Sequence, residues 1–271
     1  MNIEIVLPND FDSYSHARKE TLCLSCYGLL EYMRKVGDIY NFHDRDKVEL
    51  YISSKNKFSD ESKQILNYLK KSKTSGVLRE NVSNNINDKT CQKYLSICID
   101  INNNTDNPYY ISNKDELIAL KCNCYEKKIN KNNFIEYCNL IFDKLCYSKT
   151  IEQSLNSISK HIKTSKGKIL KHLQVLSSED FEIIKSRNNN FIDIGNALMQ
   201  YKISCSVLND RNSVPSYVFT DNNSHRSLVL ECELHTKLDS NQDNCIRIYF
   251  HPGIKHFCDN KVLIGHIGKH L

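Results

Sequence analysis

The segment Arg226–Leu238 restricts the fold more than any other part of the chain, because its side chains follow a period of two. One set of alternate positions is apolar and comprises Leu228, Leu230, Cys232 and Leu234. The other set is mostly polar and comprises Val229, Glu231, Glu233, His235 and Lys237. Successive side chains of a β-strand point to opposite faces, so this alternation predicts a strand with one buried face.

Two shorter segments follow the same pattern after polar turns. The segment Cys245–His251 alternates with Ile246, Ile248 and Phe250 on one face, and Lys261–Ile267 follows a turn at Pro252-Gly253. Three short strands with such turns predict an antiparallel meander. Its outer face would carry Glu231, Glu233, His235, Lys237, Arg247, Tyr249 and His251. That face is either a solvated surface or an acid/base and phosphate-binding surface, and the pattern leaves both interpretations open.

The composition is ordinary for a globular protein. The chain has 271 residues, enough for two domains of about 150 residues each. Its net charge of +5 allows nucleic-acid binding without requiring it. No apolar stretch approaches the roughly 20 residues of a membrane span, and no basic start precedes the first apolar run, so we expect neither a membrane segment nor a signal peptide. Twelve cysteines without an export signal indicate reduced thiols in a cytoplasm.

Four of these cysteines invite comparison with a zinc site. Cys23 and Cys26 form a CxxC pair, and Cys122 and Cys124 form a CxC pair nearly a hundred residues later. The first pair lies inside a helical pattern and the combined spacing matches no common zinc motif. We therefore predict buried thiols, with no metal and no cofactor.

The N-terminal part alternates strands with helices and predicts a small α/β domain over residues 1–125, with a largely parallel sheet. The expected strands are Asn2–Leu7, Val48–Ile52, Tyr94–Asp100 and Tyr109–Ser112. The expected helices are Ser15–Val36, one that begins near Ser59, and Lys114–Leu120. The aperiodic segment Lys121–Asn133, rich in lysine, asparagine and cysteine, is the predicted domain boundary.

The C-terminal part predicts a second domain over residues 133–271, and an α+β fold overall. Its helices are expected at Phe134–Tyr147, over Ile151–Ile162, and after a break at Lys166-Gly167. Strands at Lys202–Leu208 and Tyr217–Thr220 then precede the meander. The domain is thus a helical hairpin followed by an antiparallel sheet.

This order, with Arg247-Ile-Tyr249 in one strand and Gly265–His270 at the end of the next, resembles the RelE/HigB/ParE superfamily of small toxins. The resemblance covers about residues 134–271. It implies a metal-independent endoribonuclease that cuts mRNA, often on the ribosome, in a toxin-like or phage-defence effector. It also implies a protein partner, either an antitoxin or a subunit of a defence complex.

Such a nuclease needs a base near the RNA 2′-oxygen, an acid near the leaving 5′-oxygen, and cations around the phosphate. Histidine, glutamate, lysine and tyrosine supply the first two, and arginine suits the third. The candidate catalytic residues are Glu231, His235, Arg247, Tyr249, His266 and His270. Two structural interpretations stay open: His266 alternates in register with core positions, and Tyr249 is also a plausible packing aromatic.

Two alternatives remain. The first is a noncatalytic interaction subunit that docks a partner through an exposed sheet edge. The second is a metal-dependent nuclease in the N-terminal domain, because Asp10, Asp88 and Asp115, with the segment Tyr110–Asp115 after a strand, faintly resemble a PIN nuclease. Such enzymes gather carboxylates around Mg²⁺ or Mn²⁺. Pro8-Asn9 stands where an acid usually follows the first strand, which favours a degenerate, noncatalytic version.

Overall fold

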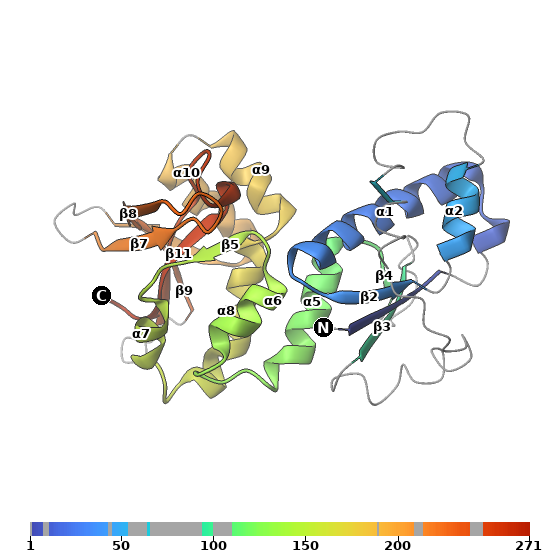
Figure 1. Cartoon of the computed structure of the whole chain (residues 1–271). Helices are drawn as coiled ribbons and strands as arrows, with labels where there is room; N and C mark the ends of the chain where they lie inside the picture. Colours follow the sequence, from blue (N-terminus) through green and yellow to red (C-terminus); the bar gives the residue numbers. More distant parts are fainter. Residues whose placement is uncertain are drawn as a thin grey trace. The chain divides into compact units, whose positions relative to one another are not determined.

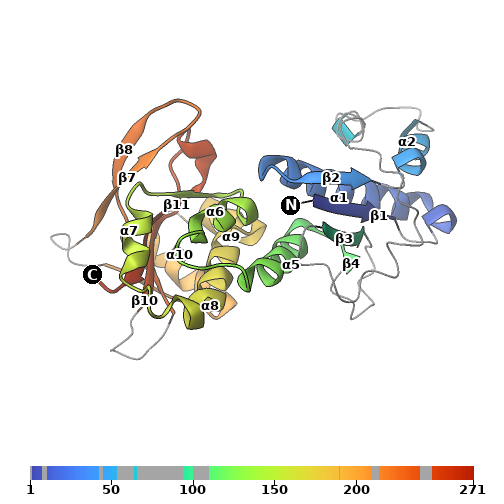
Figure 2. The same cartoon turned by 60° about the horizontal axis from the view of Figure 1, so that its bottom comes forward.

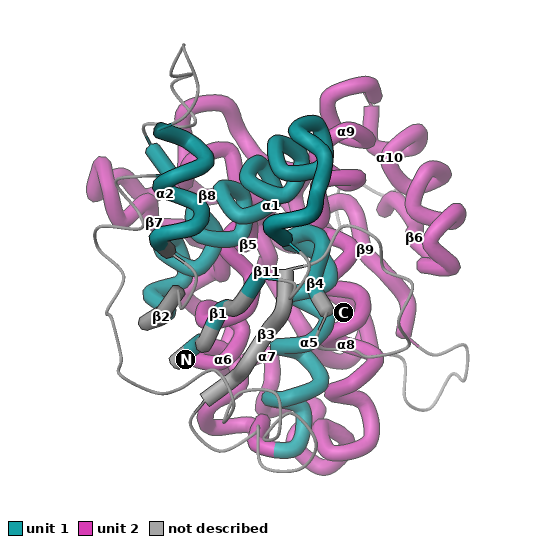
Figure 3. Tube along the Cα trace, turned by 90° about the vertical axis from the view of Figure 1, so that its right-hand side faces the viewer, with its two compact units in different colours: residues 1–127 teal, residues 128–271 magenta. Residues whose placement is uncertain are grey.

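A computed structural model describes residues 2–7, 11–42, 45–53, 64–65, 94–99, 110–188, 190–208, 214–238 and 246–271. The fold is α+β overall, as expected. The chain divides into two compact units, unit 1 at Met1–Lys127 and unit 2 at Lys128–Leu271, which Figure 3 distinguishes by colour. Within the described residues, no helix is long and apolar enough to cross a membrane.

Unit 1 contains a four-stranded, wholly parallel sheet in the order β2-β1-β3-β4. Its strands are β1 (Asn2–Val6), β2 (Ile39–Phe42), β3 (Tyr94–Ile99) and β4 (Tyr110–Ile111). Its helices are η1 (Phe11–Ser13), α1 (His16–Lys35), α2 (Arg45–Ser53) and α5 (Lys114–Glu126). The parallel arrangement matches the expectation for an α/β domain, and Figure 1 shows these elements (blue to green).

One prediction for this unit is wrong. Val48–Ile52 lies in helix α2 rather than in a strand, because Val48 and Ile52 stand four residues apart on one buried helical face. The segment Lys121–Asn133, predicted as the domain boundary, contains the division between the two units after Lys127, and its first residues up to Glu126 continue helix α5. The helix expected to begin near Ser59 lies outside the described residues.

The continuation of α5 depends on a fully buried ion pair. Lys121 Nζ donates a hydrogen bond to Asp38 Oδ2 over 2.6 Å, and both side chains are completely inaccessible to solvent. The ammonium group also lies 5.0 Å from the centre of the Tyr32 ring of α1. Asp38 follows α1 through Gly37, whose φ of +73° favours glycine. The pair therefore attaches α5 to the chain between α1 and β2.

We expect Lys121→Ala to lower the free energy of unfolding by about 3–5 kcal/mol, because it leaves the Asp38 carboxylate buried without this ammonium group. The matched control is Lys35→Ala, which removes an exposed ion pair with Glu31 within one helix and should change stability by less than about 0.5 kcal/mol. Urea denaturation followed by circular dichroism measures both. Equal losses in the free energy of unfolding for the two substitutions would show that the buried pair stabilises the fold no more than the exposed pair.

Unit 2 is built on a five-stranded mixed sheet in the order β5-β11-β10-β9-β6. Its strands are β5 (Leu145–Tyr147), β6 (Ser204–Val207), β9 (Leu234–Lys237), β10 (Ile246–His251) and β11 (Val262–Lys269). Neighbours are antiparallel except for β5, which runs parallel to β11. A separate antiparallel hairpin comprises β7 (Ser216–Thr220) and β8 (Ser227–Glu231).

Helices cover one face of this sheet. They are α6 (Phe134–Ile141), α8 (Ile162–Leu176), α9 (Glu179–Arg187) and α10 (Phe191–Leu198). Helix α7 (Ile151–Asn156) instead lies along β11, where the Ser154 hydroxyl is hydrogen-bonded to the backbone of Ile267. The Phe181 ring of α9 packs on Phe250, with ring centres 6.1 Å apart. The Nδ1 atom of His172 on α8 is hydrogen-bonded to Thr236 Oγ1 over 2.9 Å. Figure 2 shows α8 and α9 away from the β7–β8 hairpin, which lies on the other side of β11.

The alternating segment Arg226–Leu238 is not one strand, which corrects the sequence analysis. It breaks at Cys232 and Glu233 into β8 and β9, which belong to different sheets. Both break residues pair with other segments, because the Cys232 N–H donates to Pro215 and the Leu208 N–H donates to the Glu233 carbonyl. The hairpin formed by β7 and β8 can therefore fold over the sheet that contains β9.

The helical part of unit 2 also differs from the expectation of a simple hairpin. The predicted helix Phe134–Tyr147 ends at Ile141, and Leu145–Tyr147 is strand β5, which pairs with β11. Helix α8 runs through Lys166-Gly167 without a break. Helix α10 has no counterpart in the sequence analysis, although Asn190 caps it by accepting a hydrogen bond from the Asp193 N–H over 2.9 Å.

Candidate functional site

Four of the predicted catalytic residues lie close together on the face of the sheet opposite the helices. The Tyr249 ring lies at the centre, and its centre is 5.1 Å from that of His235, 5.5 Å from His266 and 6.5 Å from His270. His235 and His270 are 6.0 Å apart, and Tyr217 lies 6.3 Å from His266. We call these five side chains the tyrosine–histidine cluster.

Strand register explains this gathering. Tyr249 on β10 pairs with His235 on β9 and with His266 on β11, so the three side chains form one row across the sheet. A β-bulge in β11 keeps His266 in that row: the pairing shifts between Tyr249 and Phe250, and Gly265 is the extra residue. Simple alternation placed His235 and Tyr249 on one face, but it put His266 in register with Val262 and Ile264, and only the bulge brings His266 into the row.

The expectation that this face is open to solvent is wrong. Tyr249 is 0% exposed, His235 4% and His266 6%. The β7–β8 hairpin closes over the sheet here and forms a second apolar core that includes Phe219, Cys232 and Phe257. Sequence periodicity could not show this cover, because the alternation runs unbroken through Cys232 and Glu233, where the chain leaves the hairpin and enters the sheet.

The segment Lys269–Leu271 completes the cover. The Leu271 N–H donates to the Tyr249 hydroxyl over 3.3 Å, and His266 Nε2 lies 3.0 Å from the Lys269 carbonyl oxygen. The Lys269 and His270 side chains are exposed at the surface of this segment. A Cβ on Gly268 would lie 2.5 Å from His266 Nε2, so glycine at 268 makes room for the imidazole.

Burial sets the protonation of the cluster. Burial, together with the nearby charges of Arg247, Lys237 and His270, lowers the pKa of His235 to about 4. Burial also lowers the pKa of His266 and raises the pKa of the Tyr249 hydroxyl. At neutral pH, His235 and His266 are therefore uncharged, and Tyr249 keeps its proton.

Arg247 lies one row from the cluster. It pairs with Lys237 on β9 and with Gly268 on β11, and it is only 7% exposed. Its Nη1 donates to the Ile246 carbonyl over 3.2 Å. Arg247 and Lys237 place two cations beside the histidines, which is the charge that a phosphate group requires.

Glu231 is the predicted catalytic residue that does not join this group. It lies on β8, is exposed, and pairs with Ser216 in the two-stranded hairpin. Among the described residues it makes no hydrogen bond or ion pair to the cluster. Tyr217 was not among the predicted site residues. Its place in a predicted strand directly before the meander is the one sequence feature that could have pointed to it.

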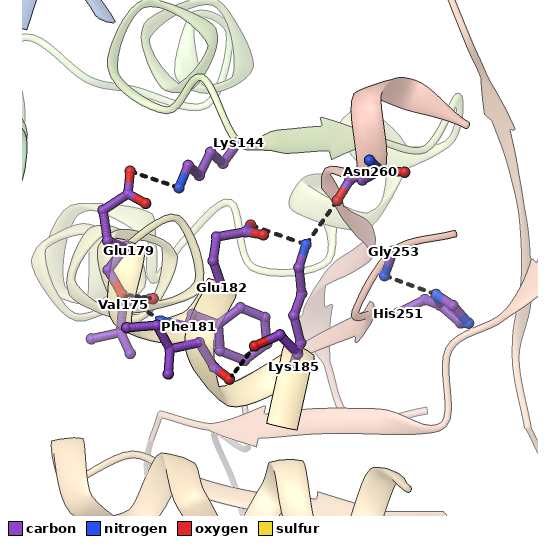
Figure 4. Close-up of polar contacts among 12 residues, drawn as sticks. Lys144, Val175, Glu179, Phe181, Glu182, Lys185, His251, Gly253 and Asn260 are labelled. Atoms are coloured by element: carbon purple, nitrogen blue, oxygen red, sulfur yellow. Dashed lines mark hydrogen bonds and ion pairs between the residues drawn. The ribbon is translucent and has the colours of Figure 1, made fainter. Parts of the chain in front are cut away.

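His251 was expected on the same outer face but lies at the end of β10 beside a cleft of about 580 Å³. Its ring packs against Phe191 of α10, 5.6 Å between centres, and its Nδ1 accepts a hydrogen bond from the Gly253 N–H over 3.1 Å. Figure 4 shows this contact beside Lys185, which donates to the Asn260 carbonyl over 2.7 Å and forms an ion pair with Glu182 at 3.0 Å. This cleft contains no member of the cluster.

A second cleft, of about 630 Å³, lies between β5, the end of β7 and the start of β11. Its walls include Cys146, Ser148, Asp221, Cys258 and Lys261. It also contains no member of the cluster, so the histidine-rich face is a packed interior and not the wall of either cleft.

The described residues contain no group of three or more His, Cys, Asp or Glu side chains that could hold a metal ion. The Cys23, Cys26, Cys122 and Cys124 thiols are buried on α1 and α5. Burial raises the pKa of Cys122 to about 12, which disfavours the thiolate that zinc binds. Asp10 and Asp88 lie outside the described residues, and Asp115 lies in the first turn of α5.

Comparison with known protein families, with curated proteins and with solved structures found no match for this chain.

We expect Gly265→Ala to destabilise unit 2 by about 1–3 kcal/mol, the usual effect of forcing extra volume into a packed core. The new Cβ would collide with the Tyr217 ring and lie 2.8 Å from Cys232 Sγ. The control is Gly28→Ala in helix α1, where a Cβ meets nothing within 4 Å and should stabilise by about 0.5–1 kcal/mol. Thermal unfolding measures both, and a neutral Gly265→Ala would mean that the hairpin does not pack on this bulge.

Stability should also fall as the pH drops from about 6.5 to about 4. The folded-state pKa of His235 lies below the ordinary value of about 6.5. Between the two values the unfolded chain binds more protons, so acid favours unfolding. Urea midpoints measured across this range should fall less steeply for His235→Gln than for the native chain. Cys205→Ser on β6, which alters packing in the same sheet without removing an imidazole, is the control. If the urea midpoint falls equally steeply with pH in His235→Gln and in the native chain, the lowered pKa of His235 is contradicted.

Proposed function

We propose that unit 2 is a metal-independent endoribonuclease, or an RNA-binding relative of one, in a toxin-like or phage-defence effector. The observation that carries the proposal is the row of His235, Tyr249 and His266, with His270 above it and Arg247 beside it. Groups that can accept a proton, donate a proton and stabilise negative charge lie next to one another here. RNA cleavage through the 2′-hydroxyl needs these three roles.

The burial of the cluster supports the following division of roles. His270 is exposed and is the imidazole in direct reach of a bound RNA, so it is the proposed proton-transfer group. Tyr249 keeps its proton and is the proposed donor to the phosphate or to the leaving oxygen. Arg247 and Lys237 hold the phosphate by charge. His235 and His266, uncharged and buried, orient the Tyr249 ring and are positioning residues rather than proton carriers.

RNA can reach Tyr249 only if the segment Lys269–Leu271 moves. The segment is linked to Tyr249 by a hydrogen bond of 3.3 Å, which the Leu271 N–H donates to the Tyr249 hydroxyl. One hydrogen bond of this kind contributes about 0.5–1.5 kcal/mol. Lys269 is also held by its N–H bond to Ser157 Oγ and by the His266 contact, so opening at His270 and Leu271 alone costs least. A phosphate oxygen could then replace the Leu271 N–H as the partner of the hydroxyl.

The test is an RNA-cleavage assay on the purified full-length chain, with and without EDTA. We expect cleavage that EDTA does not inhibit. His270→Ala should reduce the rate by about 10²–10⁴-fold, as for loss of a general acid or base. Arg247→Ala should do so too, and Arg247→Lys should recover only part of the activity, because an ammonium group lacks the planar fork of a guanidinium.

The matched control is His161→Ala, at the start of α8 and outside the cluster, which should cleave at the native rate. Melting temperatures separate loss of chemistry from loss of fold. Retained cleavage by both His270→Ala and Arg247→Ala, at unchanged stability, would contradict the proposed site. Cleavage that EDTA abolishes would instead favour a metal-dependent nuclease.

One observation favours the rival function, a noncatalytic interaction subunit. Tyr249 is 0% exposed and His235 4%, which is the burial of a core rather than of an open active site. On that interpretation the cluster stabilises the hairpin, and the chain binds an antitoxin or a defence-complex subunit. Absence of cleavage, with partner binding that survives His270→Ala, would support it.

A further inference from the structure

Two thiols of unit 2 face each other at contact distance. The Sγ atoms of Cys146 on β5 and Cys258, in the connection between β10 and β11, are 3.2 Å apart. They are separated by 112 residues in the chain. A disulfide has a sulfur–sulfur bond of about 2.05 Å, so the two atoms need to approach by only roughly 1 Å. Such proximity between residues so far apart in sequence is a property of the fold.

Both thiols lie in the wall of the second cleft, where a small reagent can enter. Cys146 is half-buried and Cys258 is 5% exposed, so Cys146 is the more accessible of the two. Cys258 is held from the other side, because its Sγ donates to the Thr220 carbonyl at the end of β7 over 3.7 Å. Cys146 is held by β5, where it pairs with Leu263 of β11.

We propose that Cys146 and Cys258 form a redox-active dithiol that a small disulfide oxidant, of the glutathione class, converts to an intramolecular disulfide. The proposal does not depend on RNA cleavage, because it concerns the covalent state of two side chains away from the tyrosine–histidine cluster.

The reaction proceeds in two exchanges. The Cys146 thiolate attacks one sulfur of the oxidant, forms a mixed disulfide, and releases one small thiolate. The Cys258 thiolate then attacks the Cys146 sulfur and releases the second small thiolate. The two protein thiols lose two protons and two electrons, and the oxidant takes up both as two small thiols.

The surroundings of the pair indicate which thiol reacts first. Burial raises the pKa of both groups, and at Cys258 the neighbouring Cys146 thiol and the Asp221 carboxylate raise it further. At Cys146 the hydrogen bond that the Cys258 thiol donates to the Cys146 sulfur, and the Lys261 charge, lower the pKa and so oppose the effect of burial. Cys146 is therefore the attacking thiol, and Cys258 resolves the mixed disulfide.

The disulfide would attach the β10–β11 connection covalently to β5. It would close a loop of 112 residues, and long closed loops restrict the unfolded chain most in the entropic description of disulfides. Oxidised protein should therefore unfold at a higher temperature than reduced protein.

The test uses the reduced full-length chain and oxidised glutathione. After acid quenching, iodoacetamide blocks the remaining thiols, and peptide mapping by mass spectrometry locates the modified residues. We expect a cross-linked peptide that joins Cys146 to Cys258, a loss of two alkylatable thiols per chain, and full reversal by dithiothreitol. Cys258→Ser should stop the reaction at a mixed disulfide on Cys146.

The matched control is Cys205→Ser, which removes a half-buried thiol of the same unit and should leave the cross-link intact. The rise in melting temperature on oxidation should appear in the native chain and in Cys205→Ser, and should vanish in Cys146→Ser. Two results would overturn the proposal: full alkylation of both Cys146 and Cys258 after oxidation, or a stable mixed disulfide on native Cys146. Peptide mapping of the oxidised native chain shows whether the Cys146–Cys258 disulfide forms, even if a variant fails to fold.

Discussion

The close approach of Tyr217 to the backbone of Gly265 is the contact on which the architecture of unit 2 depends. A side chain of any size at 265 would collide with this ring, and the bulge at this point is what keeps His266 in line with Tyr249. The β7–β8 hairpin can therefore lie directly on strand β11. Once it does, both faces of the central strands are buried: helices cover one, and the hairpin with residues 269–271 covers the other. Buried histidines, a buried arginine and a buried tyrosine follow from that arrangement.

The sequence predicted much of this fold, and its failures have identifiable physical causes. The parallel sheet of unit 1 and the pairing of β9, β10 and β11 followed from local patterns. Alternation also placed His235 and Tyr249 on one face, because side-chain direction is a local property of a strand. It put His266 on the other face, because a bulge at Gly265 does not show in the alternation. Alternation could not reveal what covers the face that carries Tyr249, which is a tertiary property. The break at Cys232 and Glu233 interrupts no periodicity, so β8 and β9 looked like one strand. Val48 and Ile52 are compatible with either element, because a short apolar run does not discriminate helix from strand.

Burial also changes what the candidate residues can do. An exposed histidine with an ordinary pKa exchanges protons near neutrality, whereas His235 and His266 stay neutral there and serve as rigid, polar packing groups. The exposed side chains on the covering segment are those of Lys269, His270 and Leu271. Any chemistry on this face therefore couples to the position of that segment. Its removal would expose Tyr249 and raise the local dielectric, which would shift the pKa of each buried histidine back toward its ordinary value.

The connection between β10 and β11 links this packed interior to the two clefts. His256, Cys258, Asp259 and Asn260 all have positive φ, between 48° and 62°. Each such residue other than glycine costs about 1–2 kcal/mol, so four of them persist only where surrounding contacts hold them. Three contacts do so: the His256 N–H donates to Asn260 Oδ1, Lys185 donates to the Asn260 carbonyl, and Asn223 donates to the Asp259 carboxylate.

These contacts come from both sides of the connection, since Asn260 and Lys185 line the first cleft, and Asn223 and Asp259 line the second. A change in either cleft that breaks one of these three hydrogen-bond contacts would let part of the β10–β11 connection relax from its positive-φ conformation. Cys258 lies inside the strained stretch, and its neighbours Phe257 and Leu263 belong to the core beneath the hairpin. A covalent bond at Cys258 would therefore constrain a segment that surrounding hydrogen bonds already hold in a strained conformation. Through Phe257 and Leu263 it would also affect the packing of the hairpin that covers Tyr249.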